Sequence, residues 1–251
     1  MGPAKFRNLS NPPIVETVID FRSSATNWSE KLKPQFVECI GPNYSKRPVE
    51  DMRQFTFEMH QKPQEAPVNK FHDQGLSGFR FFSDDSGFVV QFRQDGFSCS
   101  RMAPYTGWGT AFAEAVRLWP LYLQITGSQT VERIAVRTIN RMLLPTDRLA
   151  RSWKTMLNHA PSVPEGFSAG HFISRVWTCD PDTGIPAWIV HAFQEPVADG
   201  KSPVVLDIDV FQDKVFASNA PELITSFEPL HQLKNRLFFT CLTEEAVMLF
   251  V

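Results

Sequence analysis

Gly166-Phe-Ser-Ala-Gly170 has the Gly-x-Ser-x-Gly spacing that surrounds the nucleophile of many serine hydrolases. Asp180, Asp182 and His191 follow it, in the acid-before-histidine order of such enzymes. The serine can act only where a strand precedes it and a helix follows, because a strained turn must hold the hydroxyl beside an oxyanion hole. Here we expect a proline-rich loop before the motif and a strand after it. We therefore interpret Ser168 as a loop residue and predict no catalytic residue.

Histidines could supply a general base or metal ligands if the fold gathered them. The chain has six, which are His60, His72, His159, His171, His191 and His231. His171 and His191 are the candidates for a binding site, because they lie on adjacent predicted strands, 171–179 and 187–193. A hairpin would place them across from each other. No other feature of the sequence supports a catalytic pair.

Three arginines, Arg133, Arg137 and Arg141, are the sharpest electrostatic feature. They are four residues apart on a predicted strand, so they share one face at spacings of ~13 Å. They could form an anion or nucleic-acid surface, a mixed-charge protein interface, or a ladder of cross-strand ion pairs. The carboxylates available for such a ladder are Glu16, Asp20, Asp207 and Asp209. The nearly even balance of outward-facing charges favours the ladder.

The four cysteines are too widely spaced for a structural zinc site, which usually takes ligands in local pairs. They are Cys39, Cys99, Cys179 and Cys241. We predict free and mostly buried thiols, no bound metal and no cofactor.

Composition argues against several classes of partner. The chain has 25 Lys and Arg against 27 Asp and Glu, so it has no excess of cations to neutralise a phosphate backbone, and nucleic-acid binding is not expected. Hydrophobic residues make up 43% of the 251 residues, and most of the 22 phenylalanines should lie in the core. We find neither a signal peptide nor the ~20 consecutive apolar residues of a membrane span. A cytoplasmic protein without membrane contact is expected.

The predicted elements run through the same order twice, with the second round starting near residue 128. Each half opens with a strand, 15–22 or 131–141, which leads into a helix, 27–40 or 147–159. Several aromatic strands and a long closing helix follow in both halves. Residues 63–78, with their prolines and polar side chains, are expected to form the longest connection.

This self-similarity predicts an α+β fold of two pseudo-symmetric units, each running strand, helix, antiparallel strands, helix. The first structural repeat would be residues 1–127 and the second residues 128–251, in one compact domain with one curved sheet. The order of elements is similar to the saddle of the TATA-box-binding protein fold, or to a helix-grip fold. In such a saddle the two opening strands lie side by side, which would bring Glu16 and Asp20 near the three arginines.

Six stretches of the chain carry a family resemblance. They are Asn11-Pro-Pro-Ile-Val-Glu16, Pro104-Tyr-Thr-Gly-Trp108, Arg133-Ile-Ala-Val-Arg-Thr-Ile-Asn-Arg141, Leu206-Asp-Ile-Asp209, Leu230-His-Gln-Leu-Lys-Asn235 and Leu242-Thr-Glu-Glu-Ala246. As a set, and over nearly the whole chain, they resemble a sporadically distributed bacterial family of unknown function. The resemblance implies a stand-alone cytoplasmic protein of patchy distribution, as accessory or genetic-conflict genes often show. It implies no activity and no catalytic residues.

The leading hypothesis from the sequence is a non-catalytic protein that binds another protein, or a second copy of itself, through its sheet face or the loops at its edge. It would act on a neighbouring gene product. The alternative is an enzyme or small-molecule-binding protein with a pocket between sheet and helices, for which His171, His191 and Arg137 are the first residues to test. A ligand-sized cavity with converging polar groups would favour the alternative.

Overall fold

The computed structural model describes residues 5–24, 26–60, 68–159, 172–193 and 200–251. Its nine strands form one antiparallel sheet in the order β2-β3-β4-β5-β1-β6-β9-β8-β7. The strands are β1 Ile14–Ser23, β2 Glu50–His60, β3 Val68–Phe82, β4 Phe88–Arg93, β5 Gly96–Met102, β6 Thr130–Pro145, β7 Phe172–Cys179, β8 Pro186–Phe193 and β9 Lys201–Ala217.

Two longer helices and several short ones complete the fold. The α-helices are α1 Lys33–Cys39, α2 Trp108–Thr126, α3 Thr146–Arg151, α4 Pro221–Thr225, α5 Phe227–Cys241 and α6 Glu244–Val247. Single turns of 3-10 helix are η1 Glu30–Leu32, η2 Pro42–Tyr44, η3 Trp153–Thr155 and η4 Met248–Phe250. At the start of α6, the side chain of Thr243 accepts a hydrogen bond from the backbone N–H of Ala246 and so forms the N-cap of this helix.

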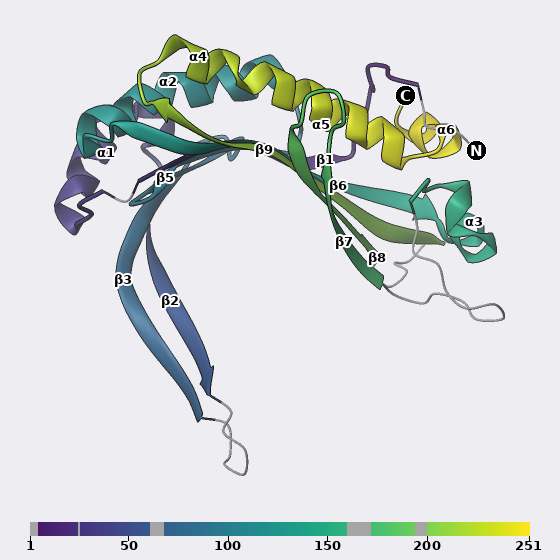
Figure 1. Cartoon of the computed structure of the whole chain (residues 1–251), viewed down its shortest axis with the longest axis horizontal. Helices are drawn as coiled ribbons and strands as arrows, with labels where there is room; N and C mark the ends of the chain where they lie inside the picture. The colour runs from purple at the N-terminus through teal and green to yellow at the C-terminus, as the bar shows by residue number, and fades with distance from the viewer. Residues whose placement is uncertain (1–4, 25, 61–67, 160–171, 194–199) are drawn as a thin grey trace.

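The sheet is curved, and the helices lie over its convex side (Figure 1). There α5 packs on β6 and β9, while α2 packs on β5 and β1. The β2–β3 hairpin extends away from these helices, as do the ends of β7 and β8 opposite their connecting turn, so the other side of the sheet is concave. In the part of the chain that the structure describes, no helix covers this concave face. The central strands therefore present one face to the core and the other to the concave side.

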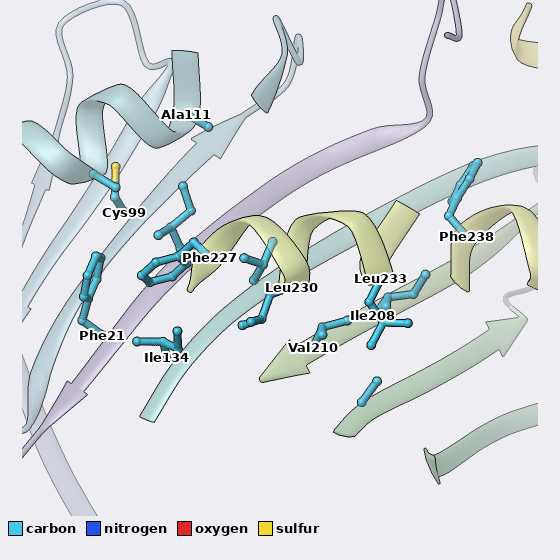
Figure 2. Packing of buried hydrophobic residues seen from close by; sticks show 14 of the residues in the cluster. Phe21, Cys99, Ala111, Ile134, Ile208, Val210, Phe227, Leu230, Leu233 and Phe238 are labelled. Atoms are coloured by element: carbon cyan, nitrogen blue, oxygen red, sulfur yellow. The ribbon is translucent and has the colours of Figure 1, made fainter. Parts of the chain in front are cut away.

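The core lies between the sheet and α2 and α5. Figure 2 shows Phe227, Leu230 and Leu233 of α5 above the sheet, where Ile208 and Val210 of β9 project toward them. All of these side chains are buried, so α5 presents an apolar stripe to the sheet. Many of the phenylalanines also lie here, as expected. Among the residues whose burial the structure describes, the fully buried ones are Phe21, Phe36, Phe79, Phe81, Phe92, Phe97 and Phe227.

The prediction of two pseudo-symmetric strand–helix units is wrong. The structure is one nine-stranded antiparallel sheet with few and mostly short helices, so the broad α+β class fits it but the repeated strand–helix units do not. The helices expected to follow the two opening strands shrink to α1, of 7 residues, and α3, of 6 residues. In α1 only Phe36 is buried, and a helix that buries so little apolar surface gains little from tertiary packing.

The prediction of a long connection at 63–78 is also wrong for residues 68–78, which the structure describes. β3 begins at Val68 and pairs with β2 from there to Arg80. Polar residues of low strand propensity adopt extended structure here because a neighbouring strand supplies the ladder of hydrogen bonds. Residues 63–67 lie outside the described residues.

The two opening strands do lie side by side. β1 pairs with β6 in antiparallel register, with Ile19 opposite Val136 at the middle of the sheet. This pairing places acidic residues of β1 next to the arginines of β6, on the concave face.

Candidate functional site

The three arginines predicted to share a strand face point to the concave side of the sheet. Arg133, Arg137 and Arg141 occupy positions of β6 that alternate with the fully buried Ile134 and Val136. Alternation along a strand puts the two sets on opposite faces. The arginines therefore lie across the sheet from the core helices.

Arg133 is the centre of a network of ion pairs that crosses several strands. Its Nη2 donates to Asp209 Oδ2 at 2.9 Å, and its guanidinium lies 3.8 Å from Asp20 and 3.7 Å from Asp213. Arg93 of β4 donates to the other oxygen of Asp20, at 2.7 Å. Burial raises the pKa of Asp209, although the positive charge of Arg133 opposes that shift. The network thus holds partly desolvated carboxylates between two arginines.

Arg137 and Arg141 differ in their partners. Arg137 donates two hydrogen bonds to Asp207, from Nε to Oδ1 at 2.8 Å and from Nη2 to Oδ2 at 2.6 Å. These bonds raise the pKa of Arg137, against the effect of its partial burial. The exposed side chain of Arg141 forms no ion pair with the described residues. The predicted ladder is therefore present at the first two arginines, and the third is a solvated charge.

The concave face is hollow, with a volume of about 680 Å³ between β4 and β8. Its lining mixes both signs of charge with serines and aromatic side chains, among them Glu16, Arg22, Gln91, Ser98, Trp188 and Phe211. On the β8 side, the Arg175 guanidinium lies over the ring of Trp188 at 4.0 Å. Stacking of this kind keeps an arginine in place while leaving its edge free for a partner.

The edge strand β7 is apolar and exposed. Ile173, Val176 and Trp177 are 80%, 51% and 54% exposed. Among the described strands, β7 is the last of the sheet and pairs on one side only, with β8. Asp180, in the turn between β7 and β8, forms an ion pair with Arg236 of α5. This ion pair attaches the turn of the β7–β8 hairpin to the helical side of the protein. A rigidly held edge with exposed apolar residues is unusual for a monomeric protein.

The histidines do not form a pair in the described structure. His191 is 3% exposed and lies on the core face of β8, opposite Leu206, whereas the arginines occupy the concave face. Burial, with the nearby charge of His159, lowers the pKa of His191 to about 4. Its Nε2 has no hydrogen-bond partner among the described residues. His171 and Ser168 lie outside the described residues. The combination of His191 with Arg137 suggested by the sequence is therefore not assembled.

A second candidate site lies on the helical side, and sequence reasoning missed it. A cavity of about 430 Å³ opens between β6 and α5, and the N-terminal segment 6–14 and residues 105–108 close it. Thr138 and Asn140 line it from the sheet, and His231 and Lys234 from the helix. This is a pocket of the kind that the alternative hypothesis requires, formed by other residues than those proposed for it.

The sequence did contain a signal for this cavity. Thr138 and Asn140 occupy inward-facing positions of β6, where core strands usually place apolar side chains. Lys234 adjoins the apolar stripe of the closing helix, four residues after Leu230. Polar residues at core positions of two elements that pack together indicate a polar pocket between them.

Other kinds of site are not evident in the described residues. Within them, no group of three His, Cys, Asp or Glu side chains is placed as a metal ion would need. All four cysteines are free, with Cys99 and Cys241 buried and Cys39 and Cys179 exposed. Among the helices described, none has both the length and the apolar character to span a membrane. Comparison of the chain with family models and with curated proteins gave no match.

Proposed function

We propose that this protein is a non-catalytic binding protein that recognises another protein along β7 and the adjoining concave face. The observation that supports the proposal is the apolar, exposed edge strand. Ile173 and Trp177 project to the concave side, and Val176 projects to the other. Large apolar side chains exposed together on one edge strand are typical of a surface that a protein partner covers.

The form of binding follows from the strand geometry. An edge strand offers a row of N–H and C=O groups to which an extended segment of a partner can add one more strand. Its side chains would then contact the concave face, where Trp177 and Trp188 lie opposite each other on β7 and β8. Arg175 and Arg141 would supply charge for an acidic residue of the partner. Aromatic and arginine side chains of this kind contribute much of the binding energy in protein interfaces.

The charges of the concave face favour a protein over a nucleic acid. Arg133 and Arg137 are already paired with Asp209 and Asp207. A phosphate backbone would have to displace these carboxylates, and it would also meet their negative charge. A folded partner with mixed surface charge does not face this cost. The proposal places the protein in the cytoplasm, acting on the product of a neighbouring gene.

The proposal is tested by affinity purification from the native cells with matched variants. Trp177→Lys places a charge on the proposed surface, and Val215→Lys places one at an equally apolar position on β9 that is 69% exposed and lies outside it. We expect one stoichiometric partner with the wild type and with Val215→Lys, and its loss with Trp177→Lys. Light scattering on the purified chain measures its molar mass in solution, and the mass of a dimer would show that the partner is a second copy.

Two results would contradict the proposal. Either the partner, or the dimer, persists in Trp177→Lys, or the wild-type protein is monomeric and brings down no stoichiometric partner. Circular dichroism of both variants establishes that they are folded.

A further inference from the structure

The cavity between β6 and α5 contains a buried lysine without a counter-ion. The Lys234 side chain is 4% exposed and forms no ion pair or hydrogen bond with the described residues. Arg7 also lines the cavity, but it is paired with Glu244. A buried ammonium group is costly unless a negative charge or several acceptors surround it. A bound anion would therefore stabilise the charged form of Lys234.

The sheet side of the cavity carries further unsatisfied groups. Thr138 and Asn140 are each 1% exposed, and both line the cavity. The amide nitrogen of Asn140 donates to Leu206 O at 2.9 Å, but its Oδ1 has no partner among the described residues, and neither does Thr138 Oγ1. Buried polar atoms in proteins are nearly always hydrogen-bonded. Two such atoms beside one unpaired lysine indicate a site built for a polar ligand.

Five aromatic side chains form much of the remaining wall, and polar side chains such as Asn8, Ser10 and Asn235 lie among them. The aromatic residues come from the N-terminal segment, from the start of α2 and the residues before it, and from α5, and they are Phe6, Tyr105, Trp108, Phe238 and Phe239. The Phe6 ring meets that of Phe239 edge-on, with centroids 5.2 Å apart. A pocket of a few hundred cubic ångströms with apolar walls and a few polar groups at one point is typical of small-molecule sites.

We propose that this cavity binds a small organic carboxylate with an aromatic body, and that Lys234 is its counter-ion. The carboxylate accepts hydrogen bonds from Lys234 Nζ and from the hydroxyl of Thr138. Asn140 Oδ1 accepts a hydrogen bond from a hydroxyl or amino group near that carboxylate. One unpaired lysine matches the single negative charge of a carboxylate, whereas a phosphate group carries a charge of about −2.

The pKa of Lys234 is consistent with this role. Burial lowers it to about 8, so the ammonium form still predominates at pH 7. His231, which also lines the cavity, is neutral at that pH because burial and the charge of Lys234 lower its pKa to about 4. Burial raises the pKa of Tyr105 to about 12. Lys234 is thus the titratable group in the cavity whose charge is available to a carboxylate.

Calorimetry with the purified full chain tests the proposal. The probes are phenylacetate, 4-hydroxyphenylacetate and indole-3-acetate, each compared with its neutral amide. We expect at least one of the carboxylates to bind and its amide to bind about 10- to 100-fold more weakly, the range of one charge-assisted hydrogen bond. Lys234→Met should weaken binding by a similar factor, and Thr138→Val by a smaller one. Lys31→Met, at an exposed lysine of η1, should bind as the wild type does.

A second measurement needs no variant. In protein carrying ¹³C-methylated lysines, the Lys234 resonance should titrate near pH 8 in the free protein and at higher pH with the bound carboxylate, because the anion stabilises the ammonium form. The proposal is overturned if none of the three carboxylates binds. It is equally overturned if the wild-type protein binds the amides as tightly as the carboxylates, or if Lys234→Met binds the carboxylates as tightly as the wild type does. Either result would mean that the cavity does not select for a negative charge.

Discussion

Trp108 lies flat on the imidazole of His231, with ring centroids 4.3 Å apart and an angle of 5° between the planes. Trp108 is the first residue of α2, and His231 is one turn into α5. The stack therefore joins the two long helices at the rim of the Lys234 cavity. The side chain of His231 is partly buried there, and this burial, together with the charge of Lys234, lowers its pKa and keeps its imidazole neutral.

Removing this stack should loosen both helices. We expect Trp108→Ala to lower the free energy of unfolding by about 2–4 kcal/mol, because it removes contacts with His231 and with Phe112, whose ring stacks on Trp108 at 4.9 Å. The pKa of His231 should rise toward its ordinary value. Urea unfolding and NMR titration measure the two effects. Trp177→Ala, at a tryptophan that is 54% exposed, should cost under about 1 kcal/mol, and equal losses in the two variants would argue against a structural role for the stack.

Lys234 should make stability rise with pH in the alkaline range. Its pKa is about 8 in the folded protein and 10.5 in an unperturbed chain. Between these values the unfolded chain holds a proton that the folded protein has lost, so raising the pH favours folding. From pH 8 to 9.5 we expect a gain of about 2 kcal/mol relative to Lys234→Met. Unfolding curves of the two proteins at several pH values give this difference, which should be absent if the lysine is solvated. Tyr105 loses its proton only at higher pH.

His191 should make the protein sensitive to acid. Its pKa of about 4 lies below its ordinary value of 6.5. Between these values His191 is protonated in the unfolded chain and neutral in the folded protein. The contribution of His191 to stability is therefore complete above pH 6.5 and is lost as the pH falls toward 4. The loss should reach about 3 kcal/mol. Thermal unfolding of His191→Leu should show a weaker dependence over this range. His159→Leu, at an exposed histidine, should keep most of the wild-type slope, and the reverse order would contradict the assignment.

The ion-pair network should depend on Arg133 more than on its peripheral members. Arg133→Met leaves Asp20 and Asp209 partly buried with one counter-ion fewer, and we expect a loss of about 1–3 kcal/mol of stability. Arg22 lies at the edge of the network, because it approaches Asp95, a partner of Arg93, no closer than 3.8 Å, and its side chain is 49% exposed. Arg22→Met should therefore change stability by under about 0.5 kcal/mol. Denaturant unfolding at neutral pH gives the free energy of unfolding of the two variants and of the wild type. A neutral result for Arg133→Met would show that the network is solvent-screened.

The concave face should not bind duplex DNA despite its shape. We expect no affinity tighter than ~100 μM at physiological salt, because most sequence-independent affinity comes from cations that are free to neutralise phosphates. Two of the three arginines on β6 are already paired with aspartates. Fluorescence anisotropy with a labelled duplex makes the measurement. Low-micromolar binding that weakens steeply with salt and disappears in Arg137→Ala, Arg141→Ala protein would overturn this prediction.

Local patterns in the sequence were enough to predict several features. Alternation along β6 separates Arg133 and Arg137 from the core, and Thr243 caps α6. Both features can be predicted locally, because each depends only on neighbours within a few residues. The apolar stripe on α5 follows from helical periodicity in the same way.

Only the tertiary structure decided the rest. Whether residues 68–78 form a strand depends on β2, and whether 147–159 form one helix depends on how much apolar surface that stretch can bury, so neither can be read from local composition. The cavity is the clearest case. Thr138 and Lys234 are 96 residues apart in the sequence, and they become one candidate site because α5 packs across β6 while an N-terminal segment closes the space between them. Burial then lowers the pKa of the lysine, and burial is a property of the folded chain alone.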